Sequence, residues 1–121
     1  MPVNKVLIVD DSNVDLMNLK KIVEQQCPHV LTANSGQDSV QVAKAEQPDL
    51  IFMDIVMDDV DGYSACRQIV SDPTTKHIPV IFVSSKRQRA DHFWAEKQGG
   101  RALISKPYTP QQIIEQINRY G

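Results

Sequence analysis

Short apolar runs alternate with longer amphipathic stretches throughout the 121 residues of this chain. The runs are continuous and rich in aliphatic residues, which is typical of strands buried on both faces of a sheet. They lie at 6–9, 29–33, 50–53, 78–83 and 102–104, and the less apolar second run is expected nearer an edge. The intervening stretches predict five helices: one between Ser12 and Pro28, others over 37–46, 62–70 and 86–98, and a last one from Pro110. This alternation predicts an α/β fold with a parallel sheet covered by helices on both faces.

Residues that commonly cap helices lie at the ends of the predicted helices. Ser12 is the expected N-cap of the first helix and Asp61 that of the third, while the Gly99-Gly100 pair is expected to stop the fourth. In the first helix, a broad apolar stripe is expected to face the core; it consists of Val14, Leu16, Met17, Leu19 and Val23.

Length and composition exclude several classes of protein. The length fits one domain over 1–121 and leaves no room for an output domain. A net charge of −2 argues against a nucleic-acid partner. No apolar run approaches the roughly 18 residues of a membrane span, and nothing resembles a signal peptide, so we expect a cytoplasmic location. Cys27 and Cys66 show no ligand spacing and are expected to be free thiols.

Polar residues follow four of the five apolar runs. Asp10 and Asp11 follow the first, Asp54 the third, Ser84 the fourth and Lys106 the fifth. Ligands bind beyond the carboxyl ends of parallel strands, so these side chains are expected to meet at one edge of the sheet. Three converging carboxylates need a cation, and oxygen ligands without His or Cys suit Mg²⁺. With the lysine opposite and a hydroxyl between, the group predicts a receptacle for a phosphoryl group, with Asp54 as nucleophile.

Five short motifs in order carry a family resemblance over the whole chain. They are Val-Asp-Asp-Ser at 9–12, Met-Asp-Ile-Val-Met at 53–57, Asp-Gly at 61–62, Val-Ser-Ser at 83–85 and Ser-Lys-Pro at 105–107. The chain thereby resembles the CheY-like receiver domain of two-component response regulators. The resemblance implies a flavodoxin-like, doubly wound sheet of strand order 2-1-3-4-5 with five helices. The residues around Phe93-Trp94 also resemble stand-alone regulators of type IV pilus chemosensory systems.

The resemblance implies a metal site and a phosphorylation site that share one residue. Asp54 would accept the phosphoryl group. Asp54 and Asp11 would ligate Mg²⁺ directly, Asp10 would act largely through water, and the backbone carbonyl of Val56 would complete the protein ligands.

The resemblance also implies a switch and a set of partners. Ser84 would turn its hydroxyl toward the phosphoryl group, and Lys106, followed by a cis bond to Pro107, would pair with it. The donor would be a sensor histidine kinase, of which the CheA type is one candidate. The protein would act as a monomer on a downstream protein through its helix 4–strand 5–helix 5 face, in twitching motility or chemotaxis. Its enzymatic activity would be limited to loss of its own phosphoryl group.

Four positions depart from the common receiver pattern. Asp58 stands where proline is frequent, Ser84 replaces the commoner threonine, Leu103 stands where many members have Tyr or Phe, and Lys86 adds a charge near the path of the attacking water. Leu103 puts the aromatic part of the usual switch in doubt. Partner recognition would then use Arg87, Arg89 and whichever of Phe93 and Trp94 is exposed, the other being expected in the core.

Four alternatives remain beside this interpretation. The protein could drain phosphoryl groups from a shared kinase, or be an interaction module that is not phosphorylated, although the five site residues are all present. A hydrolase of the haloacid dehalogenase type would need an Asp-x-Asp pair and a cap domain. A flavin carrier would need a phosphate-binding loop where Asp10 and Asp11 stand.

Overall fold

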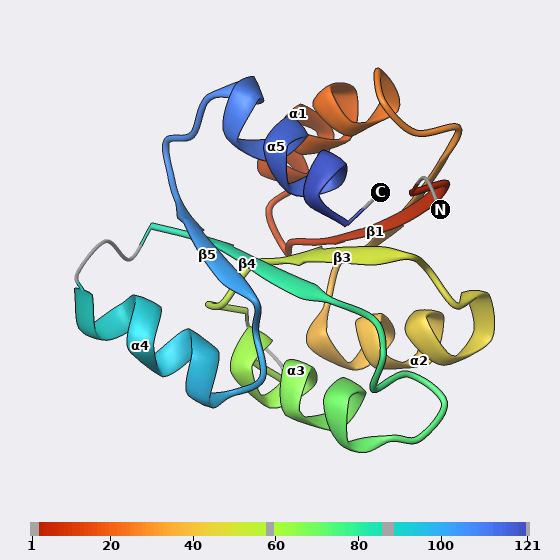
Figure 1. The fold of residues 1–121 in the computed structure, drawn as a ribbon, viewed down its shortest axis with the longest axis vertical. Helices are drawn as coiled ribbons and strands as arrows, with labels where there is room; N and C mark the ends of the chain where they lie inside the picture. Colours follow the sequence, from red (N-terminus) through yellow and green to blue (C-terminus); the bar gives the residue numbers. More distant parts are fainter. Residues whose placement is uncertain (1–2, 58–59, 86–88, 121) are drawn as a thin grey trace.

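Helices and strands alternate along the chain in the order expected from the sequence (Figure 1). The computed structural model describes residues 3–57, 60–85 and 89–120. The strands are β1 (Lys5–Val9), β2 (His29–Ala33), β3 (Leu50–Met53), β4 (Val80–Ser84) and β5 (Ala102–Ser105). The helices are α1 (Asn13–Glu24), α2 (Gly36–Glu46), α3 (Gly62–Ser71), α4 (Arg89–Lys97) and α5 (Pro110–Arg119).

The strands form one sheet in which every neighbouring pair is parallel. Its order is β2-β1-β3-β4-β5, which confirms the flavodoxin-like prediction and places β2 at an edge. In register, Val9 of β1 lies between Ala33 of β2 and Met53 of β3. The carboxyl ends of these strands therefore share one edge of the sheet.

Helices cover both faces of the sheet and divide the core into two layers. Helices α1 and α5 lie on one face, and α2, α3 and α4 lie on the other (Figure 1). Successive strand residues point to opposite faces, so Phe52 packs in the α1–α5 layer and Phe82 in the α2–α4 layer. Cys27 belongs to the first layer and Cys66 to the second, and both are free thiols as predicted.

Two expectations about apolar side chains were wrong. Val14 and Met17 of α1 are 70% and 49% exposed, so the buried stripe is restricted to Leu16, Leu19 and Val23. Phe93 and Trp94 of α4 are both exposed, although one was expected in the core. Ala95 of α4 and Gln98, which directly follows the helix, are buried instead.

The start of strand β4 differs from the prediction by two residues. Strand β4 begins at Val80 because Pro79 has no N–H for the ladder, although its carbonyl accepts a hydrogen bond from the Ile51 N–H at 3.0 Å. Helix α4 is described from Arg89, and the expected start at Lys86 lies outside the described residues. The predicted N-caps Ser12 and Asp61 are both confirmed, each accepting a hydrogen bond from a backbone N–H of its helix.

Two glycines hold the loop between β3 and α3 against its neighbours. A Cβ atom at Gly62 would lie 2.1 Å from the Asp54 carbonyl oxygen, and one at Gly36 would lie 1.9 Å from that of Val60. Neither approach is possible for a residue with a side chain, so the backbone after Asp54 is packed closely against α2 and α3.

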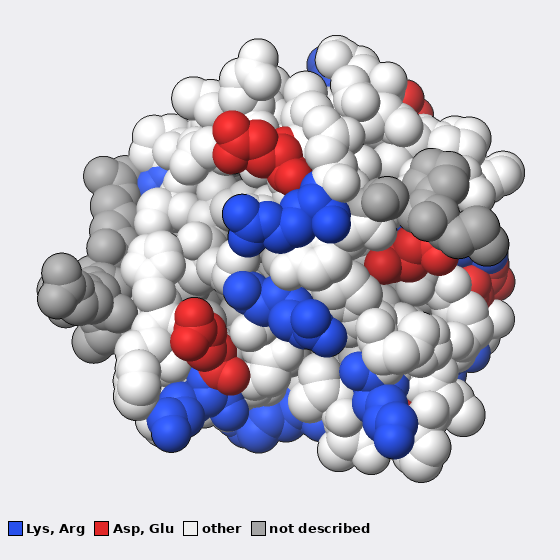
Figure 2. Space-filling model, in the orientation of Figure 1, with Lys and Arg blue, Asp and Glu red and all other residues white. Residues whose placement is uncertain are grey.

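The surface carries charges of both signs. Figure 2 shows acidic side chains beside basic ones on the face that it presents. Among the helices of the described residues, none is long and apolar enough to cross a membrane.

Candidate functional site

Three carboxylates meet at the carboxyl edge of the sheet, as the sequence predicts. Asp10 and Asp11 follow β1, and Asp54 follows the neighbouring strand β3. One oxygen from each of the three lies within 4.8 Å of the others. Asp10 is buried and Asp11 exposed, and the side chain of Asp54 is 12% exposed. The cluster is therefore open to solvent at Asp11 and largely closed at Asp10 and Asp54.

Backbone hydrogen bonds fix two of these residues. The N–H of Asp10 donates to the Ala33 carbonyl at 3.2 Å, and the N–H of Asp54 donates to the Val9 carbonyl at 2.9 Å. Both bonds extend the strand ladders by one residue beyond the last strand position. The Oδ1 atom of Asp10 also accepts from the Ser12 N–H at 2.9 Å, which orients its carboxylate.

Lys106 brings a positive charge to the same cluster from β5. Its Nζ lies 3.0 Å from Asp10 Oδ2 and 3.7 Å from Asp54 Oδ1. Its backbone N–H donates to the Ser84 carbonyl at 2.6 Å, so the ends of β4 and β5 hold the two residues together. The expected cis bond between Lys106 and Pro107 is present.

Burial and charge raise the pKa of two site residues. Burial, followed by the negative charge of Asp10, raises the pKa of Asp54 to about 6. Burial lowers the pKa of Lys106, but hydrogen bonds to Asp10 and Asp15 and the charge of Asp54 outweigh it, and the pKa rises above its ordinary value. The lysine therefore stays charged, whereas Asp54 of the metal-free protein loses its proton at a higher pH than an ordinary aspartate.

The donor set of the cluster fits a hard divalent cation. The three residues offer carboxylate oxygens close enough together to bind one ion, and no sulfur or imidazole belongs to the group. Mg²⁺ binds through a few carboxylates and keeps part of its water shell, which the exposed side of the cluster permits. The pKa of Asp54 is raised by burial first and by the charge of Asp10 second, and a cation would compensate that negative charge.

The other two predicted site residues lie at the end of β4 and just after β3. Ser84 is 1% exposed at the end of β4, and Val56 is 63% exposed two residues after Asp54. Leu103 is buried in β5. The departures at Asp58 and Lys86 lie outside the described residues, as does Arg87, and the side chain of Arg89 is likewise not described.

One charged residue of the site was missed from the sequence. The Oδ2 atom of Asp15 lies 3.1 Å from Lys106 Nζ. In the sequence Asp15 is an acidic residue in the first turn of a helix, where carboxylates are common because they favour the helix dipole. Since α1 begins at the carboxyl edge of β1, the position of this turn could have indicated that Asp15 faces the site.

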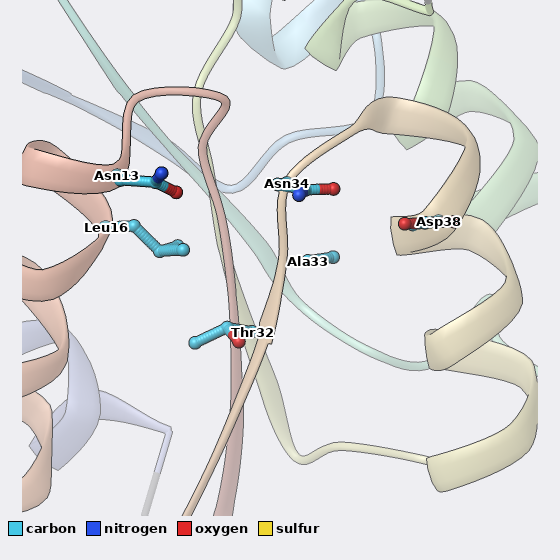
Figure 3. Close-up of a pocket in the computed structure, with 6 residues that line it drawn as sticks. All are labelled: Asn13, Leu16, Thr32, Ala33, Asn34 and Asp38. Atoms are coloured by element: carbon cyan, nitrogen blue, oxygen red, sulfur yellow. The ribbon is translucent and has the colours of Figure 1, made fainter.

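Two surface hollows lie beside the cluster. One of about 350 Å³ is lined by Asn13, Leu16, Thr32, Ala33, Asn34 and Asp38, between the starts of α1 and α2 (Figure 3). The other, about 360 Å³, is lined by Asp15, Asn18, Ile22, Lys106, Pro107, Tyr108 and Pro110. Neither is lined by the three clustered carboxylates, so the group that could bind a cation is distinct from both hollows.

Comparison with known proteins gives consistent results. The family model described as response regulator receiver domain matches residues 6–118. The protein PilH of Pseudomonas aeruginosa is 40% identical over 114 residues, which cover 94% of each chain. The crystal structure of the response regulator domain of Thermotoga maritima CheB superposes with a TM-score of 0.86 at 30% identity, covering 98% of this chain and 96% of the other.

A second similar structure contains a metal ion. It is the receiver domain of the sensor histidine kinase PA1611 from Pseudomonas aeruginosa, described with a magnesium ion coordinated in its active site cleft. Its TM-score is 0.88 at 22% identity, with 98% of this chain and 97% of that chain covered. At this identity the likeness concerns the fold.

Proposed function

Because the chain belongs to the response regulator receiver family, we propose that it is a phosphoacceptor of a two-component phosphorelay, with Asp54 as the residue that is phosphorylated. One observation carries this proposal: Asp54 lies beside both an acidic pair and a lysine cation, at the end of a central strand. A carboxylate in such a place is a nucleophile, and the surrounding charges suit a transferring phosphoryl group.

The proposed transfer begins from a phosphohistidine of a sensor kinase. A carboxylate oxygen of Asp54 attacks the phosphorus atom, a new O–P bond forms, and the N–P bond breaks, so that the imidazole nitrogen leaves with the bonding electrons. Lys106 pairs with the negative charge on the phosphoryl oxygens. The hydroxyl of Ser84, on the neighbouring strand β4, turns toward the same group. Hydrolysis of the acyl phosphate by water returns Asp54 to its free carboxylate.

A bound Mg²⁺ would compensate negative charge on the phosphoryl oxygens and the carboxylates. Asp10, Asp11, Asp54 and the Val56 carbonyl are the residues that we propose to hold it. The oxygen-only cluster supports this assignment.

We further propose that phosphorylation controls binding to a downstream protein. The surface formed by α4, β5 and α5 carries Phe93 and Trp94, which are 60% and 53% exposed. Exposed aromatic side chains are typical of binding sites for other proteins. The 40% identity to PilH supports a role in type IV pilus motility or chemosensory signalling. We propose a CheA-type kinase as the donor and a monomer as the acting form.

Labelling by a small phosphoryl donor tests the proposal. Phosphoramidate with Mg²⁺ should add one phosphoryl group to the wild-type protein, as measured by intact-protein mass spectrometry. Asp54→Asn should prevent the addition, because an amide is a poor nucleophile. Glu46→Gln, which removes a surface carboxylate at the end of α2, should label at the wild-type rate. Labelling of Asp54→Asn at that rate would show that another residue is the acceptor.

A further inference from the structure

Asp15 shares Lys106 with the proposed phosphorylation site. The Lys106 Nζ lies 3.1 Å from Asp15 Oδ2 and 3.0 Å from Asp10 Oδ2, both hydrogen-bond distances. Its distance to Asp54 Oδ1 is longer, 3.7 Å. The ammonium group therefore lies closer to the α1 side of the site than to the carboxylate that is proposed to react.

The position of Asp15 in α1 does not account for this contact. It is the third residue after the N-cap Ser12, where an acidic side chain commonly turns back to the N–H of the capping residue. Here the Ser12 N–H donates to Asp10 Oδ1 at 2.9 Å instead. The carboxylate of Asp15 is turned to Lys106, and it does not belong to the group of three carboxylates that could bind a cation.

We propose that Asp15 is a positioning residue that competes with the phosphoryl group for Lys106. This inference rests on the proposed function. By holding Lys106, Asp15 lowers the affinity of the resting site for a phosphoryl anion. An ammonium group has three N–H donors and one positive charge. A carboxylate at 3.1 Å uses one donor and reduces the attraction that the lysine exerts on an anion at Asp54.

The exposure of the pair sets the size of the effect. The side chains of Asp15 and Lys106 are 44% and 22% exposed, and both line the hollow beside Tyr108. Ion pairs that are open to water contribute little to free energy differences, so removal of the Asp15 charge should raise affinity for a phosphoryl anion about twofold to fivefold.

Beryllofluoride, a non-covalent analogue of a phosphoryl group, is the probe for the test. Its affinity at saturating Mg²⁺ is measured by ¹⁹F NMR titration of the folded variants. Asp15→Asn, which keeps the shape and an acceptor oxygen, should bind about twofold to fivefold more tightly than wild type. Asp15→Glu, which keeps the charge, should stay close to wild type. The matched control is Glu46→Gln, which removes a carboxylate 49% exposed and 3.7 Å from Lys5, and should leave affinity unchanged.

A double-mutant cycle shows whether Asp15 acts through Lys106. In the Lys106→Ala background, Asp15→Asn should lose its enhancement. An equal enhancement in both backgrounds, or an unchanged or weaker affinity of Asp15→Asn alone, would overturn the proposal. If Lys106→Ala does not fold, the beryllofluoride affinities of Asp15→Asn, Asp15→Glu and Glu46→Gln test the proposal: only Asp15→Asn should bind more tightly than wild type. Failure of the wild type to bind beryllofluoride would contradict the proposed function itself, and this inference with it.

Discussion

Asp54 combines burial, neighbouring negative charge and a nearby cation in one side chain. Burial and Asp10 favour its protonated form, whereas Lys106 at 3.7 Å favours the charged form, and the balance leaves the pKa at about 6. At neutral pH the metal-free protein therefore holds a charged carboxylate that is less stable than in the unfolded chain. The residue proposed to react is a source of strain in the resting fold.

This charge makes stability depend on pH. The pKa of Asp54 rises from 3.8 to about 6 on folding, so the stability that its proton provides is complete below pH 3.8 and is lost as pH rises through about 6. Above that, the charged form costs about 3 kcal/mol. Asp54→Asn should therefore raise the free energy of unfolding in EDTA by up to this amount at pH 7.5, and by much less near pH 4. Urea denaturation of both proteins at the two pH values measures these free energies of unfolding. A difference between variant and wild type that does not change with pH would contradict the raised pKa of Asp54.

At the scale of elements, the loop from β3 to α3 is held by close backbone approach. Gly62→Ala would place a Cβ atom 2.1 Å from the Asp54 carbonyl oxygen, so the loop or the helix must shift. We expect a loss of about 1–3 kcal/mol in unfolding free energy and slower labelling by phosphoramidate, because the carboxylate moves with its backbone. Gln68→Ala, at an exposed position of α3, is the control and should change neither. Normal labelling of Gly62→Ala would show that the loop tolerates the shift.

Ser84, at the end of β4, is expected to relay the signal, whereas Leu103, within β5, is expected to contribute mainly to stability. Leu103 is buried, and Leu103→Ala should lower the free energy of unfolding by about 2–5 kcal/mol, while beryllofluoride still shifts the amide NMR signals of α4. Ser84→Ala should remain folded and lose those shifts, because it lacks the hydroxyl that we propose to contact the phosphoryl group. The opposite pattern, in which Leu103→Ala alone loses the response, would assign the switch to Leu103.

Much of this arrangement could be predicted from the sequence, because apolar runs and parallel topology act together. Once the runs ending at Val9 and Met53 are strands of one parallel sheet, Asp10 and Asp54 must share an edge. The contact of Asp15 with Lys106 was missed because an acidic residue in a first helical turn also fits an ordinary helix start, although the place of α1 at the carboxyl edge of the sheet could have indicated it. The exposure of both Phe93 and Trp94 depends on how α4 packs, with Ala95 inward, and spacing alone did not reveal it.

At the scale of the whole molecule, the acidic cluster links metal binding to stability. A cation that binds only the folded protein adds RT ln(1 + [Mg²⁺]/Kd), about 2.7 kcal/mol at a hundredfold excess over Kd. Mg²⁺ should therefore raise the melting temperature of wild type in buffer first cleared with EDTA. Asp11→Ala should lose the response and melt no lower than wild type without metal, since one repelling charge is removed. If Mg²⁺ does not change the melting temperature of wild type, the proposed metal site is contradicted.

The division of the core into two layers places one thiol in each. Cys27 follows the end of α1 near the edge strand β2, and Cys66 lies within α3. Both are buried, and burial raises the pKa of Cys66 to about 12, so neither reacts until its surroundings open.

The two thiols are therefore native reporters of how the two layers open. In Cys27→Ala and Cys66→Ala, the rate of reaction of the remaining thiol with an aromatic disulfide measures the opening of one layer under native conditions. We expect Cys27 to react faster, through local fraying beside the edge strand, and Cys66 to react only at the rate of global unfolding. Equal rates would mean that the sheet does not separate the molecule into units that open independently. The covering of both sheet faces thus allows each half of the fold to be observed without an introduced label.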